Sequence, residues 1–455
     1  MRYGFSSRAT IGIIIGWIVA FVGFFALSIS NSVVVEGIGG IMGSTFFLAA
    51  LQLTTIGIIL SIVWVLKGIM PRLEQPMIRK LVSISIYLVM GLLAIEGLVM
   101  VYLAGDVNLT GFGGVSKKYI VLIGALLFAL GTLSLRQWRL RNVPSVNWLV
   151  DTLGSLAATM LMVEGLTVVG IANTMNLQGT GGILGSTVFN AGAQLFVLGA
   201  LMFMLWTIIQ DPYLAPRVSK YLTRRWSLVI MVVLGGMVAL EGIIASTIAG
   251  TVVIDDIGGA FKHYIVAGCA QLFALGFIAP LLWKVREIRL GWKFMPEFTS
   301  MLAMVILAFE GVFAMGLAAD TYIDGIGGIL ESTFRLAGIQ LLVLSSIGLM
   351  AWLVKGSPLL GKWPKKIVTS LPIMVLSIAA LEGLAVVVMA ANITIDEFSG
   401  VGEKYVLLGG AQMVILSSLA LFFWARSEGL SVRFKMTSTV AAAFVLLMLP
   451  IALVL

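Results

Sequence analysis

Long hydrophobic runs separated by short polar segments dominate the chain. Runs of about 20 residues, each long enough for one bilayer crossing, occur at 9–28, 45–66, 82–104, 118–136, 146–172, 187–209, 226–250, 264–283, 298–319, 334–354, 368–391, 405–424 and 436–455. The pattern predicts about thirteen transmembrane helices. The first twelve form six two-helix hairpins, and the last, 436–455, is an extra C-terminal helix.

The composition assigns the same class. Of the 455 residues 60% are hydrophobic and only 11% are charged, whereas soluble domains carry roughly 25% charged residues. We therefore expect an all-α polytopic membrane protein whose main partner is the lipid bilayer.

A glutamate followed by glycine recurs in the first helix of five hairpins. The acids are Glu96, Glu164, Glu241, Glu310 and Glu382, and the first hairpin has Val22 instead. Thirty residues after each position comes an amide, at Gln52, Gln194, Gln271, Gln340 and Gln412, with Leu126 in the second hairpin. Constant spacing predicts six tandem repeats, approximately 1–75, 76–143, 144–222, 223–293, 294–364 and 365–435, in one membrane domain of residues 1–435.

The repeats alternate between two kinds. Odd-numbered hairpins begin their second helix with Ser-Thr, as at Ser44-Thr45, whereas even-numbered hairpins have Lys-Tyr or His-Tyr, as at Lys118-Tyr119. The duplicated unit is therefore a pair of hairpins used three times, which predicts pseudo-threefold symmetry. Each hairpin crosses the membrane an even number of times, so the repeats are parallel rather than inverted.

The first apolar run follows Arg2 and Arg8 and has the appearance of a secretory signal. However, Val22-Gly23 keeps the register of the Glu-Gly pairs. We therefore expect a retained helix rather than a cleaved signal.

Positive charge predicts the orientation. Of 29 Lys and Arg, 24 lie at the N-terminus or in the joints between hairpins. The positive-inside rule then places the N-terminus and joints in the cytoplasm and the Gly-rich loops outside the cell membrane, with the C-terminus also outside. Tryptophans flank the joints, which suggests interfacial anchors. Topology explains the basic charge, so we expect no nucleic-acid partner. The predicted outer side also carries glycosylation sequons at Asn108 and Asn392.

The glutamates and amides are the candidate functional residues. Glu and Gln of one hairpin are equally far from its loop, so counting residues predicts a shared depth near the membrane midplane and a hydrogen bond within the hairpin. Glycines after each Glu and small residues before the Gln would let the two helices approach closely.

Two interpretations of this array stay open. Intramembrane acids mark proton or cation paths in many proteins, which makes Glu96, Glu164, Glu241, Glu310 and Glu382 candidate ion sites. Alternatively, the pairs join helices, with Gln194, Gln271, Gln340 and Gln412 as hydrogen-bond partners. A second acid series lies in the loops between the helices of a hairpin, at Glu36, Asp255, Asp324 and Asp396. These acids would concentrate cations at an outer mouth. Alternatively, they favour the formation of turns.

These patterns lead to two function hypotheses. The protein is a transporter or channel that moves protons, cations or a small solute, or it is a structural subunit of a larger membrane complex that associates with other subunits or itself. We expect no enzyme activity because no nucleophile–base pair or cofactor motif occurs. One Cys and one His exclude a multi-thiolate or multi-histidine metal centre.

Overall fold

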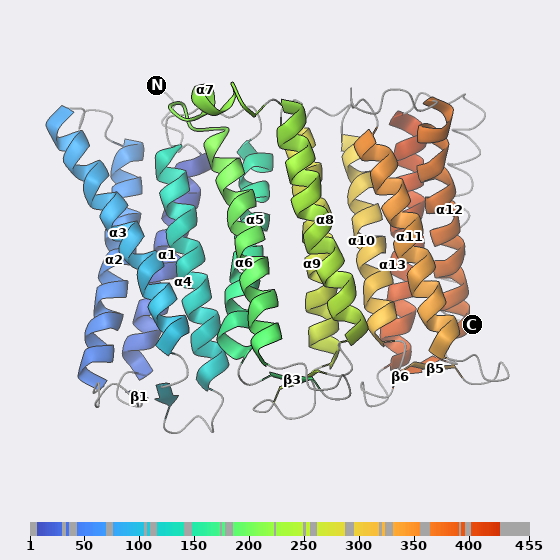
Figure 1. Ribbon diagram of the computed structural model, residues 1–455, viewed down its shortest axis with the longest axis horizontal. Coiled ribbons are helices and arrows are strands. Elements are labelled where there is room, and N and C mark those ends of the chain that lie inside the picture. The colour runs from blue at the N-terminus through green and yellow to red at the C-terminus, as the bar shows by residue number, and fades with distance from the viewer. Residues whose placement is uncertain are drawn as a thin grey trace. The chain divides into compact units, whose positions relative to one another are not determined.

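The chain folds into apolar helices joined by short connections (Figure 1). The computed structural model describes residues 7–29, 33–35, 43–69, 76–103, 107–109, 116–140, 148–172, 175–177, 185–222, 224–248, 252–254, 262–286, 295–317, 321–323, 331–354, 365–390, 393–395 and 402–427. All structural statements below concern these residues.

Twelve long helices match the twelve hairpin spans expected from hydropathy. They are α1 (Ser7–Ile29), α2 (Gly43–Ile69), α3 (Pro76–Leu103), α4 (Ser116–Arg139), α5 (Trp148–Ile171), α6 (Gly185–Ile208), α8 (Arg224–Ile248), α9 (Lys262–Val285), α10 (Met295–Leu317), α11 (Glu331–Val354), α12 (Lys365–Met389) and α13 (Gly402–Ser427). Helices are expected because a helix satisfies its own backbone groups where lipid offers no hydrogen bonds.

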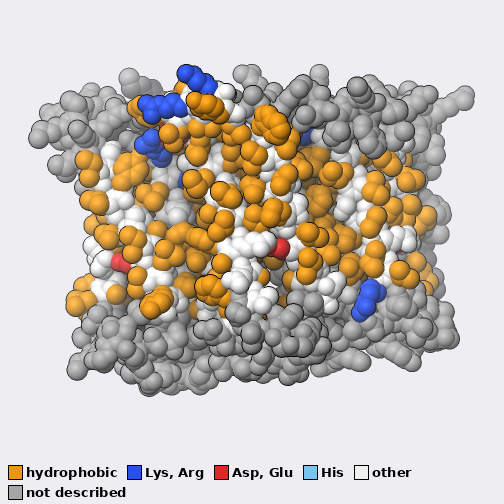
Figure 2. All heavy atoms as spheres, in the orientation of Figure 1, with side chains coloured by type: hydrophobic (Ala, Val, Ile, Leu, Met, Phe, Trp, Pro, Cys, Tyr) orange, Lys and Arg blue, Asp and Glu red, His pale blue; other side chains and the backbone are white. Residues whose placement is uncertain are grey.

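Eleven of these described helices contain apolar stretches long enough to cross a membrane, and α3 contributes the shorter stretch Ile86–Tyr102. The remaining described helix, α7 (Ala215–Val218), is a four-residue turn in the joint after α6. It does not correspond to the predicted thirteenth span, since 436–455 lies outside the described residues. On the face in Figure 2, hydrophobic side chains cover the middle of the helices, and Lys and Arg side chains gather near α7.

The helices belong to two compact units. The first comprises Met1–Ser227 with Val253–Gly258, and the second comprises Leu228–Val252 with Gly259–Leu455. The first contains α1–α7 and the second α8–α13. In both units the consecutive helices of a hairpin pack together, as α1 with α2 and α10 with α11.

Glycines allow the close packing inside each hairpin. A Cβ added to Gly311 on α10 would lie 2.8 Å from the Gly338 carbonyl oxygen of α11, and one on Gly242 would lie 2.6 Å from the Cys269 oxygen of α9. Real Cβ atoms do not approach backbone this closely. The expected glycine-mediated helix contact is therefore present, at the residue that follows each acid.

Hairpins one and two, and likewise five and six, are also joined at their loop end. Six three-residue strands occur in the described loops: β1 (Val33–Val35), β2 (Val107–Leu109), β3 (Met175–Leu177), β4 (Val252–Ile254), β5 (Thr321–Ile323) and β6 (Ile393–Ile395). Strand β1 pairs antiparallel with β2. Strand β5 pairs antiparallel with β6 (Figure 1).

The strand registers relate equivalent residues. Val34 lies opposite Asn108, and each is twelve residues after the acid position of its own hairpin. Tyr322 and Thr394 face each other with the same offset. When a residue pairs antiparallel with its own repeat equivalent, a local twofold axis passes between them. Hairpins one and two, and likewise five and six, are therefore related by a local pseudo-twofold axis.

The tryptophans near the joints are core residues, which corrects their interpretation as interfacial anchors. Six of them stand 42 residues after an acid position, one per hairpin, and none is more than 3% exposed: Trp64, Trp138, Trp206, Trp283, Trp352 and Trp424. The rings of Trp64 and Trp138 meet edge to face with centroids 5.2 Å apart. Their large apolar surface is buried between helices, whereas Trp226, outside this series, is 61% exposed.

Candidate functional site: acid–amide pairs between hairpins

Each candidate glutamate lies within the first helix of its hairpin and is half-buried. Glu96 is on α3, Glu164 on α5, Glu241 on α8, Glu310 on α10 and Glu382 on α12. The following glycine is the residue that contacts the second helix of the same hairpin. Successive helical residues point about 100° apart, so the glutamate is turned away from that contact.

Three amides bond to glutamates of the neighbouring hairpin, which corrects the pairing expected for them within one hairpin. Gln412 on α13 donates to Glu310 on α10 through Nε2–Oε1 at 2.6 Å. Gln340 on α11 donates to Glu382 on α12. Hairpins five and six thus exchange two equivalent bonds, as their pseudo-twofold relation requires. Residue counting predicts depth, but depth does not specify the direction in which a side chain points.

Hairpins one and two keep only one of these two bonds. Gln52 on α2 donates to Glu96 on α3, in the same sense as Gln340 to Glu382. The second bond would join positions 22 and 126, which carry Val22 and Leu126. The missing acid and the missing amide, which look like separate defects in the repeat, are therefore the two halves of one pair. Val22 packs against an apolar cluster that includes Leu127 of α4.

The carboxyl groups are only partly hydrogen-bonded. The Oε2 atoms of Glu96 and Glu310 are buried and have no hydrogen-bond partner among the described residues. Each group therefore receives one amide donor on one oxygen. An anion in this position would be poorly compensated within a membrane.

The remaining predicted site residues are distributed as follows. Glu164 and exposed Gln194 belong to the first unit, and half-buried Glu241 and Gln271 to the second. The outer-mouth acids Glu36, Asp255, Asp324 and Asp396 lie outside the described residues, as does Asn392. The side chain of Asn108, on β2, is likewise not described.

A charged cluster at the joint end of the first unit was missed from the sequence. Asp211, directly after α6, has a 2% exposed side chain and forms a 2.5 Å ion pair with Arg139 Nε at the end of α4. Its other oxygen accepts the backbone N–H groups of Tyr213 and Leu214 at 2.8 and 3.1 Å. Arg136 donates to the Gln210 side chain at 3.0 Å. Asp211 has no acidic counterpart in the other repeats, so the repeat pattern gave no signal for it.

The pKa of Asp211 reflects these contacts. Burial by itself raises the pKa, but the hydrogen bonds from Arg139 and from the two backbone amides, together with the positive charge, hold the pKa of this carboxyl below its ordinary value. Asp211 is therefore an anion that ties the end of α6 to α4.

The second unit has a related contact at the equivalent register. Lys284 on α9, like Arg139, stands 43 residues after the acid position of its hairpin. Its Nζ donates to the backbone carbonyls of Trp352 and Leu353 at 2.6 and 2.9 Å and lies 4.3 Å from the Trp352 ring centroid. The last carbonyls of a helix lack intrahelical partners and attract cations. In both units, therefore, a cation of an even-numbered hairpin contacts the C-terminal end of the second helix of the next hairpin.

Comparison with known proteins gives no family: no protein-family model, curated protein or solved structure matches this chain.

Proposed function

We propose that this integral membrane protein is a non-catalytic structural subunit in which acid–amide hydrogen bonds join two-helix hairpins into pairs. The observation that carries the proposal is the reciprocal exchange in the second unit, where Gln412 bonds Glu310 and Gln340 bonds Glu382. Both bonds link separate hairpins, so they stabilise the association of repeats rather than the repeats themselves.

The joint replacement of the acid by Val22 and of the amide by Leu126 supports this role. Interhelical hydrogen bonds in membranes contribute only about 0.6 kcal/mol on average. Leaving one partner buried and unsatisfied costs about 1–3 kcal/mol. A pair used for association is therefore most stable when both polar partners are kept or when both are replaced by apolar residues. Hairpins one and two show the second case at positions 22 and 126. Such a subunit would present its lipid-facing helices to other membrane subunits or to a second copy.

A double-mutant cycle tests the structural role. Glu310→Val and Gln412→Leu each leave one polar partner unsatisfied, whereas the double variant copies the residues of positions 22 and 126. Each single change is expected to lower unfolding stability in detergent by about 1–3 kcal/mol. The double change should recover part of that loss. Additive losses would show that the two residues do not act as a pair and would contradict the proposal.

A second function, proton or cation movement, is favoured by a different observation. The Oε2 atoms of Glu96 and Glu310 are buried without a partner in the described structure, and a carboxyl of this kind can take up and release a proton. Glu310→Gln and Glu241→Gln remove the titratable group while keeping its shape. Loss of ion flux in liposomes for these variants, with normal stability, would support transport. Absence of flux in the wild-type protein, or flux unchanged by both variants, would exclude a glutamate ion path.

A further inference from the structure

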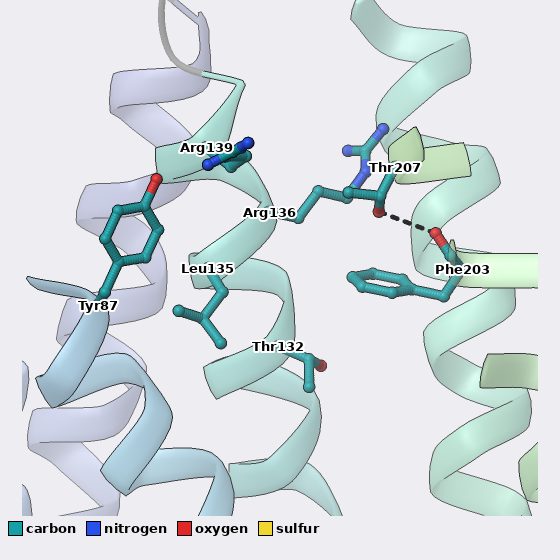
Figure 3. A pocket seen from close by; sticks show the side chains of 7 residues that line it. All are labelled: Tyr87, Thr132, Leu135, Arg136, Arg139, Phe203 and Thr207. Atoms are coloured by element: carbon teal, nitrogen blue, oxygen red, sulfur yellow. Dashed lines mark hydrogen bonds between the residues drawn. The ribbon is translucent and has the colours of Figure 1, made fainter. Parts of the chain in front are cut away.

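A cavity opens at the joint end of the first unit, between α3, α4 and α6. Its volume is about 270 Å³, and it is lined by Tyr87, Thr132, Leu135, Arg136, Arg139, Phe203 and Thr207 (Figure 3). Pockets that enclose whole small ligands measure roughly 300–1,000 Å³. This cavity therefore suits part of a larger molecule, the rest of which stays in the surroundings.

The surface that faces the cavity is almost entirely apolar, and one exposed cation, Arg139, is among the lining residues. Leu135 and Phe203 supply hydrocarbon surface. The hydroxyl groups of Thr132 and Thr207 donate to backbone carbonyls of their own helices, at 2.9 and 2.8 Å. Thr207 is bonded in this way to Phe203 (Figure 3). These hydroxyl donors are thus already used, and the two guanidinium groups contribute almost no surface to the cavity itself.

Both arginines are held in place from outside the cavity. Arg139 uses its Nε for Asp211. Arg136, only 4% exposed, reaches Gln210. A guanidinium group has five N–H donors in a fixed plane, so Arg139 retains donors after its contact with Asp211. Among the seven described lining residues there is neither Asp nor Glu.

We propose that this cavity binds an anionic phospholipid, with an acyl chain along Leu135 and Phe203 and the phosphate beside the apolar surface, at Arg139. An amphiphile is the occupant because an apolar cavity adjoins an exposed, fixed cation at the end of membrane helices. Guanidinium groups bind phosphate oxygens in a bidentate manner, and basic pockets between membrane helices on the cytoplasmic side take acidic headgroups. The charge distribution predicts that this end is cytoplasmic.

The test uses the full-length protein purified in detergent and incubated with equal amounts of phosphatidylglycerol and phosphatidylcholine. Native mass spectrometry then reads the bound lipid. Phosphatidylglycerol is expected to be enriched, and Arg139→Gln should lower that enrichment about fivefold, since one basic residue near a membrane surface contributes about that factor. Arg217→Gln, a change of the same kind at an exposed residue of α7, should leave it unchanged.

Two further measurements keep the proposal falsifiable if Arg139→Gln folds poorly. Leu135→Trp fills the cavity without changing its charge and should also reduce bound phosphatidylglycerol. Glycerol phosphate should not displace the lipid at equal concentration. Equal binding of the two lipids would overturn the assignment, as would an equal loss of phosphatidylglycerol enrichment in Arg139→Gln and Arg217→Gln. Displacement by glycerol phosphate would also overturn it, because the cavity would then be a site for a soluble anion.

Discussion

At the scale of single residues, the direction in which a side chain points decides its role. Glu310 and Gly311 are adjacent, yet Gly311 contacts the helix of its own hairpin and Glu310 bonds the next hairpin. Asp211 shows the same dependence on position: at the end of α6 it reaches Arg139 and two backbone amides at once. Single substitutions at these positions should therefore have large and distinct effects.

Asp211→Asn tests the buried ion pair by its pH dependence. Because the folded-state pKa of Asp211 is below its ordinary value of about 3.9, the carboxylate stabilises the fold fully above that value. Its contribution falls as pH drops through the ordinary value toward the lowered folded pKa. The variant should be less stable at pH 7 by about 1–3 kcal/mol. The difference from wild type should shrink below about pH 4.

Thermal unfolding in detergent between pH 7 and pH 3 measures this difference. If the stability difference between wild type and variant stays constant or increases on acidification, the ion pair is not the cause of that difference.

Gly235→Ala tests the close approach of α8 and α9. Its added Cβ would meet the carbonyl oxygen of Gly276 and lie 2.9 Å from Pro280 Cγ, so the helices must separate. Overpacking of this kind typically costs about 1–3 kcal/mol. Gly236→Ala, one residue further on the same helix, is the matched control because nothing lies within 4 Å of its added Cβ. Equal stability of the two variants would contradict the packing.

At the scale of elements, hairpins use different surfaces for different neighbours. Glycines form the contact inside a hairpin. Strands, acid–amide bonds and the Trp64–Trp138 contact join the hairpins of a pair. Cations at helix ends join one pair to the next hairpin, through Arg139 and Lys284. The pair of hairpins is thus held together at its loop end, along its helices and, in the first unit, at its joint end.

A disulfide tests the strand register directly. Tyr322 lies opposite Thr394, and directly opposed residues have Cβ atoms about 4.5–5.5 Å apart. Tyr322→Cys with Thr394→Cys should therefore crosslink in high yield under mild oxidation, as judged by a mobility shift that reductant reverses. Thr321→Cys with Ile393→Cys is two positions out of register and should crosslink poorly. Higher yield for this second pair would indicate a different register. The single native Cys269 is buried.

At the scale of the whole molecule, charge asymmetry predicts how the chain lies in the membrane. The described joint between α6 and α8 contains Arg217 and Lys220, whereas the loop between α10 and α11 contains Asp324. By the positive-inside rule this asymmetry predicts that the joints lie in the cytoplasm and the loops outside. The pseudo-threefold arrangement of the three hairpin pairs stays a prediction.

Cysteine labelling tests the orientation. In a Cys269→Ala background, Asp324→Cys should react with a membrane-impermeant maleimide in intact cells. Ser219→Cys, exposed beside α7, should react only after the cells are permeabilised. The opposite accessibility would invert the topology, and labelling of both sites in intact cells would show that the assay cannot distinguish the two sides.

Much of the fold could be predicted from the sequence because lipid leaves the chain few choices. A long apolar run must become a helix to satisfy its backbone, so all twelve hairpin helices match expected runs. The constant spacing of Glu, Gly and Gln likewise predicted equal depth and the glycine contact. The pairing of Gln412 with Glu310, the burial of the six repeated tryptophans and the Asp211–Arg139 cluster were not predicted.

The reason lies in what residue counting can measure. Counting from a loop gives the depth of Glu310 and Gln340 along their helices, and the sequence alone determined that depth. Only the tertiary structure decided their partners, because the Gly311 contact turns Glu310 toward α13 and away from α11. It also revealed that Val22 and Leu126, 104 positions apart in the sequence, occupy the two halves of one lost pair. Sequence spacing places a side chain along a helix axis, whereas helix packing determines which neighbour it faces.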